Sequence, residues 1–145
     1  MSLKFKRLLP EAVLPTRAHP TDAGLDLTAV DAYRDKQNHD IIVYKTGIAV
    51  EIPKGYVGLI FPRSSVSKQQ SRLSNAVGVI DSGYTGEITF KFDHKGSDYS
   101  FMNVYNIGDR VGQLVVVPCL LLEAEWTDKL TETDRGEGSY GSSGS

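Results

Sequence analysis

The chain has 145 residues, a length that fits one domain, and its formal net charge is −2. This charge argues against binding to nucleic acid or an anionic membrane, and no apolar run approaches the about 20 residues of a membrane-spanning helix. The single cysteine, Cys119, excludes an intrachain disulfide and a cysteine-rich zinc site, and its place in the apolar run 114–122 predicts a buried thiol. Because the N-terminus lacks the continuous apolar segment of a secretory signal, we expect a soluble, cytoplasmic protein.

Short apolar segments, alternating or continuous, follow one another along the chain and are typical of β-strands. The predicted strands are, in chain order, 3–8, 25–29, 40–44, 46–52, 55–61, 76–81, 87–92, 99–105, 112–117 and 119–126. Residues 31–40 are expected to form a loop, and 64–71 is the one segment that favours a short helix. Turn signals between these segments make an all-β sandwich or barrel the predicted fold.

Two of the predicted strands lack the polar alternation of a strand that has one face in water. Residues 42–43 and 114–117 are apolar throughout, as in strands that are covered on both faces. Because a domain of this size has a small core, a neighbouring subunit of a trimer or dimer is a natural source of the second cover.

The character of the chain changes after residue 126, where it becomes polar and rich in glycine and serine. The sequence therefore divides into a β-rich core, residues 1–126, and a flexible arm, residues 127–145. The arm is either a disordered tail or a functional segment whose backbone N–H groups, near Arg135 and Tyr140, wrap an anion. Its glycine spacing is similar to the start of a P-loop, but Ser142 stands where the P-loop lysine belongs, so we reject that interpretation.

The stretch 76–86, AVGVIDSGYTG, is the most informative part of the sequence. A short apolar strand ends at Asp81, and Tyr84 follows in a turn that Gly83 and Gly86 permit. The carboxylate is either a solvated turn residue or a general base held at the end of a rigid strand. The tyrosine is either a half-buried aromatic of the sheet or a flat surface for a sugar.

Other polar positions suit a ligand that carries phosphate. Arg63 can bind two phosphate oxygens, with Ser64 and Ser65 as further donors, although a helix cap with a surface arginine explains these residues equally well. Gln113 opens an apolar strand and needs a partner, such as a water or a phosphate. Asp26 alternates with two leucines and is either a solvent-facing residue or an outer-sphere partner of Mg²⁺.

The remaining polar groups have simpler interpretations. Asp109 and Arg110 follow a glycine and predict a turn with a local ion pair. The three histidines, His19, His39 and His94, lack the spacing of metal ligands, which argues against a zinc site.

Five segments, taken together, resemble the ordered motifs of the trimeric dUTP pyrophosphatase (dUTPase) family. They are AGLDL (23–27), PRSS (62–65), the stretch 76–86, GDRVGQ (108–113) and RGEGSYGSSG (135–144). The resemblance implies a jelly-roll-like β-barrel or sandwich subunit and a homotrimer with its active sites at subunit interfaces. It also implies that the arm of one subunit closes over a site that the other two subunits build.

The resemblance further implies a reaction, in which dUTP is hydrolysed to dUMP and pyrophosphate with Mg²⁺ as cofactor. Asp81 would deprotonate the water that attacks the α-phosphorus, and Gln113 would contact that water or a phosphate. Tyr84 would pack on the deoxyribose and exclude a 2′-hydroxyl, and Asp26 would lie near the Mg²⁺-bound triphosphate. The other implied contacts are Asn75, Val79, Ile80 and Thr89 to uracil, Arg63, Ser64 and Ser65 to phosphates, and Arg135, Tyr140, Gly141, Ser142 and Ser143 from the arm.

The sequence departs from the family pattern at four positions, none of which removes a catalytic group. Tyr140 replaces the usual phenylalanine, Gly83 a common acid, Ser65 a common glycine and Gly112 a frequent alanine.

Three alternatives differ in function. A dCTP deaminase shares the fold and the Arg-Ser-Ser motif, but it needs a catalytic glutamate where this chain has Lys91, and a lysine cannot replace that carboxylate. A nucleotide-gated regulator would bind a protein partner through the arm, with the loop 31–40 and the stretch 93–99 as candidate surfaces. A purely structural trimer would bind no nucleotide and would give Asp81, Arg63 and Arg135 no shared purpose.

Overall fold

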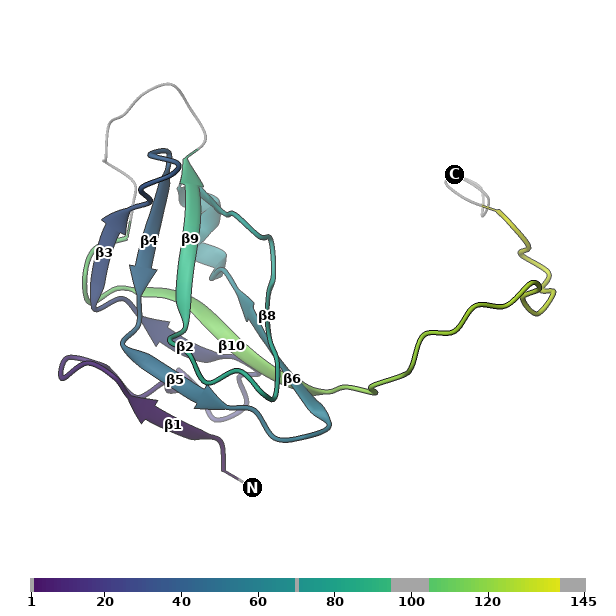
Figure 1. Ribbon diagram of the computed structural model, residues 1–145. Helices are drawn as coiled ribbons and strands as arrows, with labels where there is room; N and C mark the ends of the chain where they lie inside the picture. Colours follow the sequence, from purple (N-terminus) through teal and green to yellow (C-terminus); the bar gives the residue numbers. More distant parts are fainter. Residues whose placement is uncertain (1, 70, 95–104, 139–145) are drawn as a thin grey trace.

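The computed structural model describes residues 2–69, 71–94 and 105–138 (Figure 1). Its elements are β1 (Lys4–Arg7), β2 (Leu25–Thr28), β3 (Asp31–Arg34), β4 (Ile41–Lys45), β5 (Ile48–Glu51), β6 (Tyr56–Phe61), the 3₁₀ helix η1 (Ser64–Lys68), β7 (Ser71–Leu73), β8 (Gly78–Ile80), β9 (Thr89–His94) and β10 (Arg110–Pro118). The expected all-β fold is therefore confirmed. The described part of the chain has no helix with the length and apolar character needed to cross a bilayer.

Two four-stranded antiparallel sheets enclose the core. One has the strand order β2-β10-β6-β8 and the other β3-β4-β9-β7, while β1 and β5 form a separate pair. The first sheet contributes the buried side chains of Leu27, Ile60 and Leu114, and the second those of Tyr44, Phe90 and Phe92. Apolar residues at alternate positions of each strand therefore meet between the sheets, which is the driving force for this arrangement.

Two strands were missed by the sequence analysis. The strand β3 lies within the predicted loop 31–40 and pairs with β4, and β7 follows η1 and pairs with β9. Both strands are too short to show a clear apolar–polar pattern in the sequence. They form because a neighbouring strand stabilises each of them. The predicted strand 99–105 lies outside the described residues except for its last residue, Tyr105.

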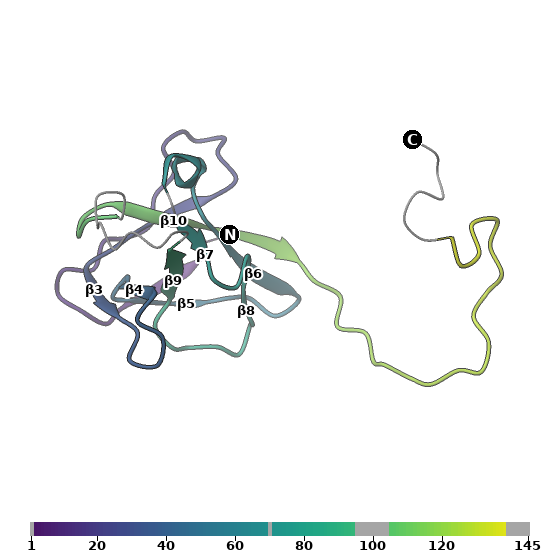
Figure 2. The ribbon, with the colours of Figure 1, turned by 90° about the horizontal axis from the view of Figure 1, so that it is seen from above.

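The predicted strand 119–126 was wrong for this chain. After β10 the chain leaves both sheets and extends away from them (Figures 1 and 2), and its apolar side chains are exposed, with Leu122 at 84% and Trp126 at 103%. An apolar pattern forms a strand only where a neighbouring strand supplies hydrogen-bond partners. Cys119 is partly exposed as a result, so the expectation of a buried thiol was also wrong.

The outer face of the sheet β2-β10-β6-β8 is apolar. Since Ile60 and Leu114 face the core, their neighbours along β6 and β10 face outward. These outward residues are Val57, Leu59, Phe61, Val115 and Val117, and each is only partly buried by the chain itself. The continuous apolar run 114–117 thus has one face in the core and one still partly open, whereas Ile42 and Val43 are both buried.

Candidate functional site

The predicted site residues gather in two separate hollows of the surface. One, which we call the β10 hollow, has a volume of about 430 Å³ and is lined by Asp22, Gly24, Asp26, Arg63, Ser64 and Gln113. The other, the hairpin hollow, has a volume of about 230 Å³ and is lined by Asn75, Val79, Ile80, Asp81, Tyr84 and Thr89. The structure therefore brings together most of the predicted residues, but as two groups.

Strand pairing assembles the β10 hollow. Gln113 lies opposite Asp26 of β2 on one side and opposite Phe61 of β6 on the other, and Arg63 follows β6 after one residue. The Gln113 side chain donates a hydrogen bond from Nε2 to the carbonyl oxygen of Pro62 over 3.3 Å, which supplies the partner that its position requires. A Cβ atom at Gly24 would lie 2.3 Å from Gln113 Oε1, so a larger residue there would displace the end of the Gln113 side chain.

Asp26 is bound by two arginines. Arg63 donates from Nε to Oδ1 over 3.0 Å, and Arg110 donates from Nη1 to Oδ2 over 2.9 Å. The Asp26 side chain is 14% exposed. Because Asp22 also lines the hollow, the two carboxylates and the two guanidinium groups balance in charge, so an anion could bind only through arginine N–H groups that Asp26 does not use. The sequence pattern did not indicate this role for Arg110.

The expected local pair between Asp109 and Arg110 was wrong. The Asp109 carboxylate accepts a hydrogen bond from the backbone N–H of Asn106 over 2.7 Å, and the backbone N–H of Asp109 donates to the carbonyl of Asn106 over 3.0 Å, so the turn closes without Arg110. Arg110 then begins β10 opposite Thr28 of β2, where its side chain reaches Asp26. Ser65 lies apart from the β10 hollow, with its Oγ 3.5 Å from the phenol oxygen of Tyr105.

The hairpin hollow is built around the end of β8. The backbone N–H of Tyr84 donates to the carbonyl of Asp81 over 3.0 Å, which closes the predicted turn. The Asp81 side chain is exposed and accepts no hydrogen bond from any described residue. Ile80 is 8% exposed and packs in the core, whereas Val79 is 61% exposed, so Ile80 can offer a ligand little more than its backbone.

Tyr84 rests on the backbone that follows it. Its hydroxyl donates to the carbonyl oxygen of Glu87 over 2.9 Å, and the side chain is 43% exposed. A Cβ atom at Gly86 would lie 2.5 Å from the tyrosine oxygen, so a larger residue at that position would displace the ring. One face of the ring is therefore held by the hairpin, and the exposed remainder is available to a ligand.

The loop that enters the hairpin contains Asn75. The next residue, Ala76, has a φ of 58°, in the left-handed region that a non-glycine residue seldom adopts. Strained backbone of this kind clusters at ligand sites. At the other end of the hairpin, Thr89 begins β9 opposite Lys45 of β4.

The two hollows lie toward opposite edges of one sheet. Asp26 belongs to β2 and Val79 to β8, which are the two edge strands of the sheet β2-β10-β6-β8. The outward apolar residues of β6 and β10 lie between them. Arg135 belongs to neither group, since it lies in the extended arm, where its Nε donates to the carbonyl of Gly138 over 3.1 Å. Tyr140, Gly141, Ser142 and Ser143 lie outside the described residues.

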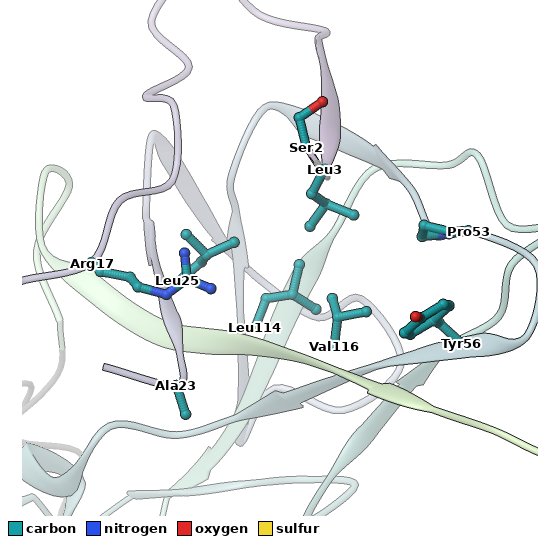
Figure 3. Close-up of a pocket in the computed structure, with 9 residues that line it drawn as sticks. All are labelled: Ser2, Leu3, Arg17, Ala23, Leu25, Pro53, Tyr56, Leu114 and Val116. Atoms are coloured by element: carbon teal, nitrogen blue, oxygen red, sulfur yellow. The ribbon is translucent and has the colours of Figure 1, made fainter. Parts of the chain in front are cut away.

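A third hollow contains none of the predicted residues. Figure 3 shows it lined mainly by apolar side chains, including Leu3, Leu25, Tyr56 and Val116, with Arg17 as its one charged group. The described residues contain no cluster of three or more His, Cys, Asp or Glu side chains that could hold a metal by themselves.

A family comparison decides between the interpretations of these motifs. The family model of dUTPase matches residues 10–144. This chain belongs to the dUTPase family. The match confirms the resemblance that the five motifs carry, and it supports a dUTPase over a dCTP deaminase.

Curated dUTPase relatives cover nearly the whole chain. The deoxyuridine 5′-triphosphate nucleotidohydrolase of Rhodococcus erythropolis is 41% identical over 145 residues, which is 99% of this chain and 87% of the relative. The protein of the same name from Anaplasma marginale is 42% identical over 134 residues, covering 90% of this chain and 88% of the relative.

Solved dUTPase structures share the fold. The dUTPase of Staphylococcus bacteriophage 80alpha with dUPNHPP superposes with a TM-score of 0.83 at 30% identity, covering 99% of each chain. A mutant dUTPase of phage phi11 of S. aureus, described with a structural Mg(II) ion, has a TM-score of 0.73 at 29% identity and covers 89% of this chain and 98% of that one.

Proposed function

We propose that this chain hydrolyses dUTP to dUMP and pyrophosphate, which keeps uracil out of DNA and supplies dUMP. The observation that carries the proposal is that Asp81 and Tyr84 line the hairpin hollow together with Asn75 and Thr89. Membership of the dUTPase family supports the same reaction. The relatives are named for this reaction, and the phage 80alpha neighbour is described with dUPNHPP.

Asp81 is proposed as the general base. Asp81 lies directly after β8, whose residue Ile80 is anchored in the core. Its backbone is therefore held in place, while its exposed carboxylate can contact a water. It takes a proton from a water whose oxygen bonds to the α-phosphorus, while the bond to the bridging oxygen breaks and pyrophosphate leaves.

The nucleoside is proposed to bind in the hairpin hollow. Uracil has edges of amide-like donors and acceptors, which suit Asn75, Thr89 and the backbone of Val79 and Ile80. The Tyr84 ring packs on the deoxyribose, where a 2′-hydroxyl would meet its face.

The triphosphate is proposed to bind Arg63, Ser64, Ser65 and Gln113, with Arg135, Tyr140, Gly141, Ser142 and Ser143 closing from the arm. Mg²⁺ bound with the substrate neutralises triphosphate charge. A Mg²⁺ ion usually keeps several waters and binds through one or two carboxylates plus phosphates. The β10 hollow offers the Asp26 carboxylate, whose two oxygens already accept hydrogen bonds from Arg63 and Arg110, so it suits only outer-sphere contact with the ion through water.

A homotrimer is proposed to complete the site. The two groups of residues lie toward opposite edges of one sheet, and a contact that joins opposite edges of identical chains is heterologous. Such a contact closes into a three-membered ring when each copy is rotated by one third of a turn relative to the next. The partly open apolar face of β6 and β10 and the exposed leucines after Pro118 supply surface for such contacts. We retain the division into a core, 1–126, and an arm, 127–145, as part of this proposal.

The proposed function is tested by measuring pyrophosphate release with Mg²⁺ from dUTP, dCTP, dTTP and UTP. Release from dUTP alone is expected. Equal release from dUTP and UTP would contradict the role of Tyr84, and ammonia release from dCTP would indicate a deaminase.

A regulatory function is the second candidate. The phage 80alpha neighbours are described as controlling transfer of virulence genes by a G protein-like mechanism. This alternative would be supported if dUTP binds to this chain without release of pyrophosphate. It would also require that the chain binds a protein partner and that this binding is lost when the arm is truncated at Thr133.

A further inference from the structure

We propose that Glu87 is a positioning residue that fixes Tyr84 and so sets the discrimination between deoxyribose and ribose; the inference rests on the proposed role of Tyr84 at the sugar. Glu87 does not belong to the predicted site. It lines the hairpin hollow, and it links the tyrosine to the turn between β4 and β5.

The Glu87 carboxylate is bound to the turn between β4 and β5. Its Oε1 accepts a hydrogen bond from the backbone N–H of Gly47 over 2.8 Å, and its Oε2 lies 3.5 Å from Lys45 Nζ. The Glu87 side chain is only 21% exposed. A partly buried carboxylate that accepts a backbone N–H is a stronger anchor than an exposed ion pair.

Several hydrogen bonds hold the turn between β4 and β5 in place. Gly47 has a φ of 67°, and its carbonyl accepts the backbone N–H groups of Leu8 and Leu9 over 2.8 and 3.2 Å. Thr46 is 1% exposed and donates from its hydroxyl to the carbonyl of Ile88 over 2.6 Å. The backbone N–H of Ile88 in turn donates to the carbonyl of Ile48 over 2.9 Å. The segment that leaves the hairpin is therefore bonded to this turn at two successive residues.

The backbone of Glu87 extends this support to the ring. Its carbonyl oxygen is the acceptor of the Tyr84 hydroxyl, at 2.9 Å. The ring is thus held at the Glu87 carbonyl at one end and at its own backbone, bonded to Asp81, at the other. If the Glu87 carboxylate is removed, the carbonyl that holds the hydroxyl loses its side-chain anchor.

Exclusion of a hydroxyl needs this rigidity. A pocket that merely fails to bind an added hydroxyl rejects it only weakly, by about 100-fold. Discrimination against ribose falls further if the Tyr84 ring can move away from the sugar, because the 2′-oxygen then has room. A fixed ring face is what makes a 2′-hydroxyl costly, whereas uracil and phosphate contacts do not depend on the ring position.

The test compares the full-length chain with Glu87→Ala, Glu87→Asp and Glu87→Gln. The alanine variant removes the anchor, and the aspartate variant keeps the charge but is one methylene too short. The glutamine variant retains an oxygen that accepts from Gly47. The matched control is Glu51→Ala, which removes an exposed carboxylate of the neighbouring strand β5 that pairs only with Lys4 among the described residues.

The readout is the ratio of kcat/KM for dUTP to that for UTP, with the affinity ratio of dUMP to UMP as a second measure. Glu87→Ala and Glu87→Asp are expected to lower both ratios by about tenfold, while Glu87→Gln stays within about threefold of wild type and Glu51→Ala is unchanged. A purely structural role would lower thermal stability and leave the ratios unchanged, and that result would overturn the proposal.

The outcomes separate this inference from the proposed function. If the wild-type chain releases no pyrophosphate from dUTP, the proposed function fails, and the dUMP to UMP affinity ratio still decides the role of Glu87. If Glu87→Ala does not fold, Glu87→Asp decides it by the same ratios.

Discussion

Arg63 donates a hydrogen bond from Nε to Oδ1 of Asp26 over 3.0 Å, so the aspartate orients the arginine that is proposed to bind phosphate. With Nε committed in this way, the terminal nitrogens of the guanidinium group have no hydrogen-bond partner among the described residues. They form the edge that a phosphate would meet. Asp26 therefore has a positioning role toward Arg63 in addition to any contact with hydrated Mg²⁺.

Arg110 should matter to substrate binding although no sequence motif assigns it a ligand. The variant Arg110→Ala leaves Asp26 with one arginine and makes the orientation of Arg63 less defined. Because the Arg110 side chain is 49% exposed, we expect a modest rise in KM for dUTP, about two- to fivefold, with kcat little changed. Steady-state kinetics check this, with Arg72→Ala as a control at an exposed pair with Asp93. An unchanged KM would contradict the role of Arg110.

Asp81→Asn tests the general base. The amide has the size of the carboxylate but cannot accept the proton from water, so the fold and dUTP binding should persist while kcat falls at least about 100-fold. Pyrophosphate release and dUTP affinity measured on one preparation separate the two effects. Asp40→Asn, at an exposed turn position, is the matched control, and turnover near wild type in Asp81→Asn would exclude the assignment.

Deletion of residues 134–145 tests the arm. The described arm residues make no hydrogen bond to the sheets, so the thermal stability of the remaining chain should not change. Turnover should drop strongly, because Arg135 and the residues after it are proposed to close over the triphosphate. Full activity of the truncated chain would remove the arm from the mechanism.

The parts of the site that the sequence predicted are those that local chain geometry defines. Asp81 and Tyr84 are joined by a single turn whose glycines are visible in the sequence, and the structure brings both to one hollow. The contact between Arg110 and Asp26 joins residues 84 positions apart. Its existence depends on which strands pair and in what register, and one sequence holds no signal for that.

The same limit explains the errors in the fold. The segment 119–126 is apolar as far as Leu122 and alternates after it, a pattern that predicts a strand, but a strand also requires a neighbouring strand to pair with. The strand β3 has no clear alternation and forms because β4 lies beside it. Glu87 was missed for a related reason, since its side-chain partner Gly47 is 40 positions away.

Gly112 is a departure from the family pattern that the structure explains. A Cβ atom there would lie 2.1 Å from the ring of Phe90, which is fully buried, and 2.9 Å from the carbonyl of Phe61. Gly112→Ala should therefore destabilise the fold by about 1–3 kcal/mol, as overpacking of a core does. Denaturant unfolding measures this, and Phe90→Leu combined with Gly112→Ala should recover part of the loss. Equal stability of Gly112→Ala and wild type would contradict the account.

The ion pair of Asp35 with Lys91 should make stability depend on pH in the acid range. Lys91 Nζ lies 2.8 Å from Asp35 Oδ2. The hydrogen bond from Lys91, with backbone hydrogen bonds from Gln37 and Asn38, lowers the pKa of Asp35 from 3.8 to about 2. Because the folded pKa lies below the unfolded one, the contribution is complete above about pH 4 and is lost as the pH falls toward 2.

Asp35→Asn removes this dependence and keeps the size of the side chain. Urea midpoints of the variant and the wild type, measured from pH 2 to pH 6, should differ most above pH 4 and converge toward pH 2. The Lys91 pKa is raised by the same partner, so its charge is retained throughout this range. A difference that stays constant from pH 2 to pH 6 would mean that the Asp35 charge does not stabilise the fold, and that the amide acts only by changing the turn that Asp35 caps.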